Sequence, residues 1–231
     1  MRIYKDCYEM IREVERDLFE MGIKFQSETV QDKVVKDDPN FMTLELTGYD
    51  YKLTGYDKLD EMLKYLNISE EWVSQDFMER IEDKFLNPGD AWKINSELWE
   101  QYLHDGMFQY TYNERIRGQL PLLLRELTSR RNTRQGIITI YDYHQDIMNW
   151  GSKGRVPCSM YYQFFIRNNK LQMIYVMRSC DFLKHFAGDV ALAIKMLFYI
   201  SEKINVEVGT FTHFIGSLHA FYIDLNKRGI F

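Results

Sequence analysis

A cysteine at the start of a strand-like segment is the residue of this sequence best placed for nucleophilic chemistry. Cys158 directly follows Pro157, and the residues after it alternate between aromatic and polar side chains, as in a β-strand. A second such segment ends near Arg178, and Asn168-Asn169 between the two suits the tight turn of a hairpin. The hairpin would bring the Arg178 guanidinium close to the Cys158 thiol and favour the thiolate. Because the thiolate is the form that attacks an electrophile, the sequence predicts a cysteine nucleophile here.

Two further polar residues begin or interrupt later apolar segments. Asp189 lies at the start of an apolar helix, and His219 lies within Gly216-Ser217-Leu218-His219. A carboxylate at a helix N-terminus is favoured by the helix dipole, so capping is a competing explanation for Asp189. A lone cysteine is likewise more often an inert core residue than a nucleophile. The chemistry therefore depends on whether the fold brings these residues together.

Hydrophobic periodicity predicts elements that could position them. Apolar residues at three- and four-residue steps predict a helix over 4–21 that ends at Gly22. Ser69 suits the N-cap of a helix over 69–84, and residues 190–200 are apolar almost all round, as in a buried helix. Leu46-Thr47-Gly48-Tyr49-Asp50 returns at 53–57, which predicts two similar turns. Further helices are expected over 57–66 and over 114–128, where Pro121 makes the helix start late or bend. Strands are expected over 41–46, 136–140 and 210–225, and loops over 28–40 and 143–157.

Composition restricts the class of protein. With 231 residues, of which 45% are hydrophobic, the chain can bury one substantial core, and we expect a single domain over residues 1–231. A net charge of −5 offers no basic face for nucleic acid, so a small anionic substrate held by a few local cations is expected instead. Three cysteines without metal-type spacing argue for a reducing cytoplasm and against a disulfide framework or a metal site. No uncharged run is long enough to cross a membrane, so a soluble cytoplasmic protein is expected.

Several motifs in order resemble the thymidylate synthase family over roughly residues 95–224. They are Pro-Cys, Gln-Phe, Arg-Ser-x-Asp, a polar residue eight positions after that aspartate, and Gly-x-x-His. Asp189, where the synthases usually carry asparagine, and Met177-Arg178-Ser179 resemble the phage-type deoxycytidylate hydroxymethylases. The resemblance implies an α/β fold, in which a mixed sheet carries helices on one face, and a homodimer formed through the sheet. It also implies methylenetetrahydrofolate as the one-carbon donor and a pyrimidine nucleoside monophosphate as the acceptor.

The resemblance also implies roles for individual residues. Cys158 would attack C6 of the pyrimidine, Asp189 would contact the base, and Asp181 would face the folate pterin. Arg178 and Ser179 would bind the 5′-phosphate. Gln163 would lie beside the nucleotide, and His219 would bind a hydroxyl of the sugar. The tyrosine that the family places two residues after this histidine is Phe221 here, which weakens the recognition of the 3′ position.

Other family residues have no unique counterpart. A catalytic glutamate on a helix corresponds best to Asp76, with Glu71 and Glu79 beside it, although each suits a solvated helix face equally. Trp99 and Tyr112, 13 residues apart, match a folate-contacting tryptophan and a tyrosine near the pyrimidine, or are ordinary aromatics.

The family's phosphate-binding residues outside the hairpin have no single counterpart in this sequence either. Two arginines that reach a partner's phosphate site correspond to Arg134 with Arg131 behind it, or to a solvated basic turn. The early loop offers only Lys33 and Lys36 where the synthases have an arginine.

The implied reaction begins with a thiolate adduct at C6, which makes C5 reactive toward the one-carbon unit. Water adding to the resulting exocyclic methylene would give a 5-hydroxymethyl product, and hydride would give a methyl product. Asp189 favours cytosine over uracil, and the chain lacks the tail that closes over folate in the synthases, which favours the water route. We therefore expect a dCMP hydroxymethyltransferase, and the resemblance suggests a role in making modified phage DNA in the host cytoplasm. The alternatives are a thymidylate synthase acting on dUMP and an inactive nucleotide-binding relative.

Overall fold

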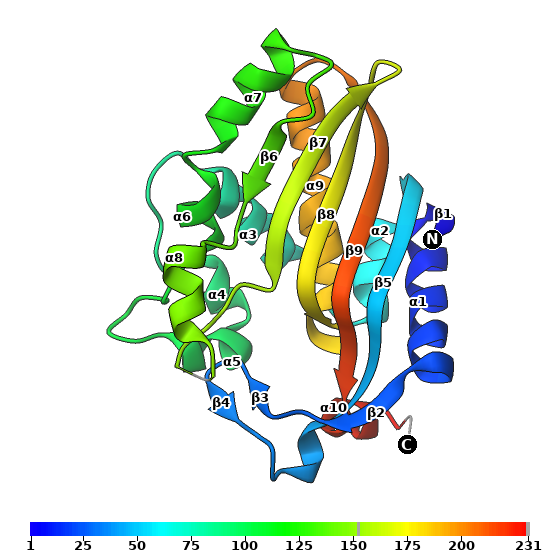
Figure 1. Ribbon diagram of the computed structural model, residues 1–231, viewed down its shortest axis with the longest axis vertical. Helices are drawn as coiled ribbons and strands as arrows, with labels where there is room; N and C mark the ends of the chain where they lie inside the picture. Colours follow the sequence, from blue (N-terminus) through cyan, green and yellow to red (C-terminus); the bar gives the residue numbers. More distant parts are fainter. Residues whose placement is uncertain (152, 230–231) are drawn as a thin grey trace.

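A seven-stranded mixed sheet forms the centre of the computed structural model, which describes residues 1–151 and 153–229 (Figure 1). Its strands run in the order β1-β5-β9-β8-β7-β6, and β2 pairs with one end of β5. The β1–β5 and β8–β9 pairs are parallel and the others antiparallel. The strands are β1 (Arg2–Asp6), β2 (Ile23–Gln26), β5 (Met42–Asp57), β6 (Gly136–Thr139), β7 (Ser159–Arg167), β8 (Lys170–Asp181) and β9 (Glu207–Phe221). A separate small hairpin consists of β3 (Thr29–Val30) and β4 (Lys33–Val34).

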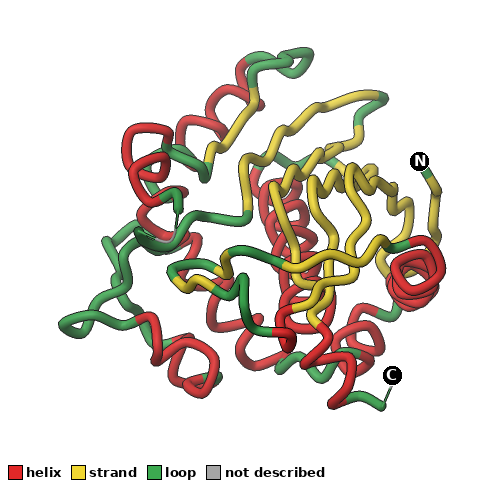
Figure 2. Tube along the Cα trace, turned by 60° about the horizontal axis from the view of Figure 1, so that its bottom comes forward, coloured by secondary structure: helices red, strands yellow, loops and turns green. Residues whose placement is uncertain are grey.

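Helices lie behind this sheet and along both of its sides in the view of Figure 1. They are α1 (Cys7–Met21), α2 (Leu59–Tyr65), α3 (Glu70–Ile81), α4 (Ala91–Ile94), α5 (Ser96–Trp99), α6 (Tyr112–Ile116), α7 (Leu120–Ser129), α8 (Tyr143–Asp146), α9 (Ala187–Lys203) and α10 (Tyr222–Lys227). The predicted buried helix is α9, which packs on β8 and β9 and is covered by α2 and α3. Figure 2 shows the strands (yellow) and the helices (red) around them in a second orientation. The predicted mixed sheet with packed helices is confirmed.

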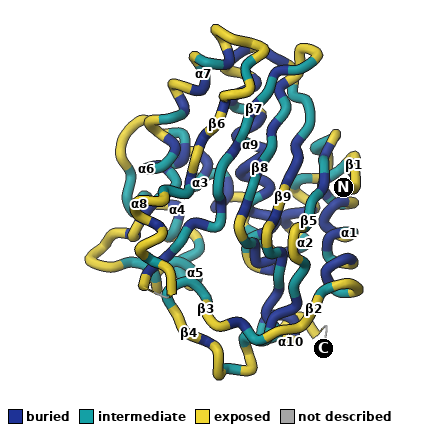
Figure 3. The backbone as a smooth tube through the Cα atoms, in the orientation of Figure 1, coloured by how far each residue is buried: buried dark blue, intermediate teal, exposed yellow. Residues whose placement is uncertain are grey.

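The opposite face of the sheet is more accessible, as Figure 3 shows by the alternation of buried and less buried residues along β7 and β8. On β7, Tyr162 and Phe164 point into the core. Tyr161, just before them, and Phe165, just after them, are only partly buried. Apolar side chains also stand on this outer face of the neighbouring strands: Phe214 is 43% exposed. In the part of the chain that the structure describes, no helix is long and apolar enough to span a membrane.

The hairpin that carries the cysteine forms as predicted. β7 and β8 pair in register from Arg167↔Lys170 to Ser159↔Met177, with a shift near Ser159. Asn168 and Asn169 have φ values of 51° and 57°, the left-handed conformation that asparagine tolerates in tight hairpin turns. The hairpin therefore places the start of β7 beside the end of β8.

The predicted turns and several helix and strand limits are wrong. The two copies of the short repeat lie in one strand, β5, because this strand is held by ladders to β1, β2 and β9. The predicted helix over 114–128 is two helices, α6 and α7, with Pro121 in the first turn of the second, where no N–H is needed. The final strand ends at Phe221 and α10 follows. The loops over 28–40 and 143–157 contain the β3–β4 hairpin and α8.

Candidate active site

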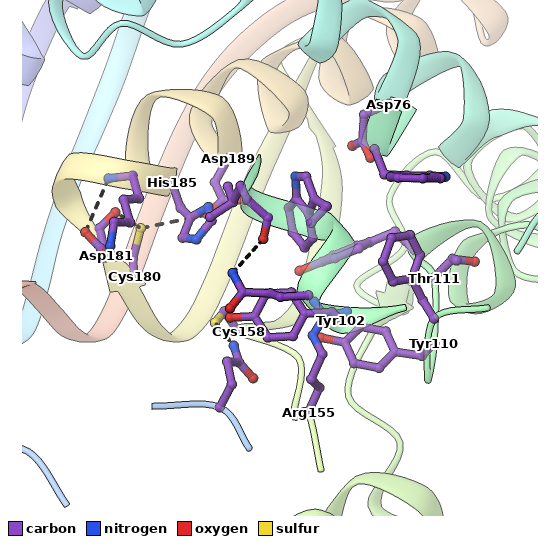
Figure 4. Close-up of a pocket in the computed structure, with 18 of the residues that line it drawn as sticks. Asp76, Tyr102, Tyr110, Thr111, Arg155, Cys158, Cys180, Asp181, His185 and Asp189 are labelled. Atoms are coloured by element: carbon purple, nitrogen blue, oxygen red, sulfur yellow. Dashed lines mark hydrogen bonds between the residues drawn. The ribbon is translucent and has the colours of Figure 1, made fainter. Parts of the chain in front are cut away.

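A cavity of about 360 Å³ lies where the ends of β8 and β9 meet α3, the start of α9 and the β3–β4 hairpin. Figure 4 shows Cys158 near its middle, with Asp76 and Asp181 toward opposite sides. Most of the residues that sequence reasoning assigned to a site line it, namely Asp76, Trp99, Tyr112, Cys158, Arg178, Ser179, Asp181, Asp189 and His219. Their assigned roles stay predictions, but one cavity holds them together.

Cys158 is surrounded by hydrogen-bond donors. The Ser179 hydroxyl donates to its Sγ at 3.6 Å, and an Nη atom of Arg178 lies 3.9 Å from the same sulfur. The pairing that the sequence predicted is thus present, and the Arg178 backbone N–H also donates to the Cys158 carbonyl at 2.8 Å. A guanidinium and a hydroxyl therefore face a half-buried sulfur, and these surroundings suit a cysteine nucleophile.

The other two cysteines have a different environment. Cys7 and Cys180 are at most 1% exposed. Burial raises the pKa of Cys7 to about 12 and the pKa of Cys180 well above its usual value. Among the described residues, Cys158 is therefore the thiol that a substrate can reach.

Arg178 is fixed by its own chain before any ligand binds. Its Nε donates to the Pro157 carbonyl at 2.9 Å, and an Nη donates to the Val156 carbonyl at 2.9 Å. Its other Nη donates to the Ser179 hydroxyl at 3.0 Å. These bonds hold the segment that precedes the cysteine against the end of β8.

Sequence reasoning missed Gln31, which reaches the cysteine from the β3–β4 turn. Its amide Nε2 lies 3.9 Å from the Cys158 Sγ, and its Oε1 accepts a hydrogen bond from the Val156 N–H at 3.4 Å. Gln31 has a positive φ of 53°, as a residue at a tight turn can. The early loop thus contributes an uncharged amide, whereas Lys33 donates to Gln101 at 2.7 Å. No local sequence signal marks a contact between positions 127 residues apart.

Tyr112 belongs to a buried hydrogen-bonded group beside the cysteine. Its hydroxyl bonds to the Ser159 Oγ at 2.9 Å, and Ser159 bonds in turn to the Tyr175 hydroxyl. Burial raises the pKa of Tyr112 well above its usual value, so its phenol stays protonated. The guanidinium of Arg80 lies 3.9 Å from the centre of the Tyr112 ring, a cation–π contact.

The three carboxylates considered for a catalytic role on α3 have different surroundings. Asp76 lines the cavity and is paired with buried Arg80 at 2.6 Å. Glu79 accepts from the backbone N–H groups of Asp90 and Ala91, each at 2.7 Å, and so stabilises the start of α4. Glu71 is exposed on the first turn of the helix. Of these residues, Asp76 has the position that fits the prediction best.

Asp189 lies half-buried at the wall of the cavity, in the first turn of α9. Burial raises the pKa of its carboxyl from 3.8 to about 7, while the positive charge of Arg80 opposes the rise. Its Oδ2 accepts a hydrogen bond from the Cys180 thiol at 3.8 Å. Because no backbone N–H of the helix is capped by this side chain in the described contacts, capping does not account for it.

The remaining cavity residues have structural contacts as well. Asp181 caps the helical turn that follows β8 by accepting from the N–H groups of Leu183 and Lys184. His219 contacts the Ser217 hydroxyl at 3.2 Å through its Nδ1. The Trp99 ring stacks on Trp72, with 6.4 Å between ring centres.

Two predicted site residues lie outside the cavity. Gln163 is on the outer face of β7, and its side-chain amide donates to the Arg134 carbonyl at 3.0 Å. Arg134 is exposed, and Arg131 contacts Asn169 at the hairpin turn. Within one chain, none of the three reaches Cys158, so any contact with a nucleotide requires a second chain.

Comparison with known proteins identifies the family. The thymidylate synthase family profile matches residues 40–227, which is most of the chain. This protein belongs to the thymidylate synthase family. The family uses methylenetetrahydrofolate as its one-carbon donor.

Individual thymidylate synthase relatives match over part of their length. The protein named "Putative thymidylate synthase" of Methanocaldococcus jannaschii is 32% identical over 122 residues, which are 52% of this chain and about half, 54%, of that protein. The protein of the same name from Methanosarcina mazei is 30% identical over 169 residues, 64% of this chain and 73% of that protein.

Solved thymidylate synthases share the fold. The enzyme from T4 phage aligns with a TM-score of 0.69 and 16% identity, covering 94% of this chain and 78% of that one. Thymidylate synthase A from Bacillus subtilis aligns with a TM-score of 0.67 and 15% identity, covering 98% and 83%.

Proposed function

We propose that this protein transfers a one-carbon unit from methylenetetrahydrofolate to C5 of a pyrimidine nucleoside monophosphate, through a covalent adduct on Cys158. The observation that carries the proposal is the half-buried Cys158 thiol, contacted by Arg178 and Ser179 inside a cavity of about 360 Å³. The family membership supports the reaction class.

The proposed reaction follows from the chemistry of a thiolate adduct. The Cys158 thiolate bonds to C6 of the pyrimidine, and C5 then attacks the methylene carbon of the donor. Both carbon–nitrogen bonds that join the methylene carbon to the donor break, and the two donor nitrogens take up protons. C5 loses its hydrogen as a proton, which leaves an exocyclic methylene. Tyr112 is placed to assist at the base, because its phenol bonds to the residue next to the nucleophile.

For the fate of the methylene we propose addition of water. Water supplies hydroxide to the methylene carbon, the C6–sulfur bond breaks, and the thiolate returns with a 5-hydroxymethyl product. Cytidylate, with dCMP first, is the proposed substrate because Asp189 supplies a carboxyl group in the cavity. A protonated carboxyl can donate to the N3 acceptor of cytosine while its second oxygen accepts from the amino group. The pKa of about 7 makes that protonated form available near neutral pH.

The same pKa supports a second candidate, the methylation of dUMP. A protonated carboxyl offers one donor and one acceptor, as an asparagine amide does, so it can also pair with the N3–H and the carbonyl of uracil. In this candidate hydride from the folate, rather than water, completes the product.

The test is mass spectrometry of nucleotide products after incubation with methylenetetrahydrofolate and dCMP, CMP or dUMP in separate reactions. Hydroxymethylated cytidylate is the expected product. Methylated dUMP would overturn the water route and the cytosine assignment. No product from any nucleotide, together with protection of Cys158 from alkylation by a nucleotide, would indicate a binding protein without turnover.

We also propose a homodimer formed through the open face of the sheet. Tyr161, Val176 and Phe214 stand in register across β7, β8 and β9 on that face, and Phe214 is 43% exposed. Gln163 and Arg134 are at the same side, where a second chain could use them. Light scattering after size-exclusion chromatography should give twice the mass of one chain, and Phe214→Glu should give a monomer; a monomeric wild-type protein would contradict the proposal.

A further inference from the structure

A buried arginine in the cavity wall has no acidic partner. Arg155 is 8% exposed and lies three residues before the cysteine nucleophile. No carboxylate of the described residues lies within 4.0 Å of its guanidinium, and its Nε has no hydrogen-bond partner. The guanidinium carbon is instead near four aromatic rings, 4.6 Å from the ring centre of Tyr102, 5.0 Å from Tyr110, 5.3 Å from Trp99 and 5.9 Å from Phe108.

This arrangement differs from that of two other arginines whose side chains are at most 10% exposed. Arg80 is paired with Asp76 at 2.6 Å, and Arg115 is paired with Asp146 at 2.8 Å. An unpaired buried charge is costly, and contacts with aromatic rings compensate only part of that cost. Arg155 therefore has hydrogen-bonding capacity left that the protein itself does not use.

Hydrogen bonds of the Arg155 backbone hold this residue in place. The Arg155 backbone N–H donates to Gln109 Oε1 at 2.7 Å, and its carbonyl accepts from Asn149 Nδ2 at 3.1 Å. The aromatic rings confine the side chain, which lines the same cavity as Cys158 (Figure 4). A preorganised guanidinium can bind an oxyanion through two parallel hydrogen bonds at little further cost in entropy.

By comparison, Arg178 is already occupied. Each of its three guanidinium nitrogens donates to a protein acceptor, at Pro157, Val156 or Ser179. It can still contact a ligand, but it does not provide two guanidinium nitrogens that are free of protein hydrogen bonds. The cavity thus contains two guanidinium groups near the cysteine. That of Arg178 is hydrogen-bonded to the protein, and that of Arg155 has no hydrogen bond to the residues that the structure describes.

We infer that Arg155 is an anion-binding residue of this cavity, which takes the oxyanion of a bound ligand. The identity of that ligand rests on the proposed function: the oxyanion is the phosphate of the nucleotide or a carboxylate of the folate side chain. Both offer the paired oxygens that a guanidinium recognises.

The experiment compares Arg155→Met, which removes the charge and keeps an unbranched apolar side chain, with Arg125→Met at an exposed arginine on α7. Calorimetric titration measures the dissociation constants of inorganic phosphate, of dCMP and deoxycytidine, and of tetrahydrofolate and a tetrahydropterin without the glutamate side chain. In Arg155→Met, loss of a charged hydrogen-bond partner should raise the dissociation constant of the anionic ligand of one pair about ten- to a hundredfold. The dissociation constant of its uncharged counterpart should not change. Arg125→Met should bind all ligands like the wild type.

The pairs identify the anion. Weaker binding of dCMP and phosphate assigns Arg155 to the nucleotide phosphate, and weaker binding of tetrahydrofolate alone assigns it to the carboxylate. Equal dissociation constants for every ligand in Arg155→Met and wild type would overturn the inference, as would a wild type that binds none of the anions. Thermal unfolding of unliganded Arg155→Met should begin no lower than for the wild type, which separates lost binding from lost structure.

The outcome is independent of turnover. If Arg155→Met weakens anion binding but the wild type makes no product, the inference stands and the proposed function fails. If the wild type makes product and Arg155→Met binds all ligands equally well, the proposed function stands and the inference fails.

Discussion

Ionisable groups in two corners of one cavity have opposite surroundings. In the cysteine corner, which we define as Cys158, Arg178, Ser179 and Gln31, a sulfur is met by donors and remains accessible. In the acid corner, Asp189 lies with Cys180 near the paired Asp76 and Arg80, and burial dominates. The first arrangement surrounds an accessible sulfur with hydrogen-bond donors, and the second favours an uncharged carboxyl that can donate a hydrogen bond. The comparison shows that residue type alone does not decide the chemistry open to a group, since two cysteines 22 positions apart have opposite surroundings.

The largest effect should come from removing the nucleophile. Cys158→Ser should lower kcat by roughly four orders of magnitude or more, because covalent activation of the pyrimidine is lost. The same assay on Cys7→Ala, which removes a buried thiol distant from the cavity wall, should give nearly wild-type turnover. Comparable losses in both variants would show that the cysteine corner has no special role.

Next in size is the effect of the acid corner on the choice of base. Asp189→Asn places an amide where the carboxyl was. The amide can donate to O4 of uracil at any pH, whereas the carboxyl can do so only while it is protonated, and its ionised form repels that oxygen. The ratio of kcat/KM for dCMP to that for dUMP should therefore fall by about one order of magnitude, the value of one hydrogen bond gained by dUMP. An unchanged ratio measured by competition between the two nucleotides would remove Asp189 from base recognition.

The acid corner should also be visible in stability against pH. The Asp189 carboxyl has its pKa raised to about 7 when folded, so unfolding between about pH 4 and 7 releases its proton. The free energy of unfolding should therefore fall as pH rises through this window and change no further from this group above it. The total contribution is up to about 4 kcal/mol, from 1.36 kcal/mol for each pKa unit. Urea unfolding of the wild type and Asp189→Asn should diverge across this range, and parallel curves would contradict the assignment.

The smallest expected effect is at the edge of the cysteine corner. Gln31→Ala removes one weak amide contact with the sulfur, 3.9 Å long, and should slow alkylation of Cys158 about two- to tenfold. The base preference of Gln31→Ala should equal that of the wild type, because the acid corner is untouched. A changed base preference would mean that the two corners are not independent.

The parts of the site that sequence could predict are those built from neighbouring segments. The Asn168-Asn169 turn fixes the hairpin register, so the approach of Arg178 to Cys158 follows from local signals. The position of Asp189 at a helix start also follows from a local apolar pattern.

The parts that it could not predict depend on distant segments. Gln31 meets the cysteine from 127 residues away, and the aromatic surroundings of Arg155 come from a separate stretch of the chain. The length of β5 is set by its ladders to three other strands, which outweigh the turn-like glycines in its sequence. Gln163 and Arg134 show a further limit, because a role that needs a second chain cannot be seen within one.

The central claim is that Cys158 bonds covalently to C6 of a pyrimidine whose C5 then receives the one-carbon unit. A 5-fluoropyrimidine nucleotide tests it directly, because fluorine at C5 cannot leave as a cation and the adduct should persist. The protein would be incubated with methylenetetrahydrofolate and 5-fluoro-dCMP or 5-fluoro-dUMP, digested, and analysed by mass spectrometry. The account predicts that the peptide containing Cys158 gains the mass of nucleotide plus methylene and folate, with 5-fluoro-dCMP the better reagent. An unmodified Cys158 peptide with both reagents, from protein that binds the nucleotides, would contradict it.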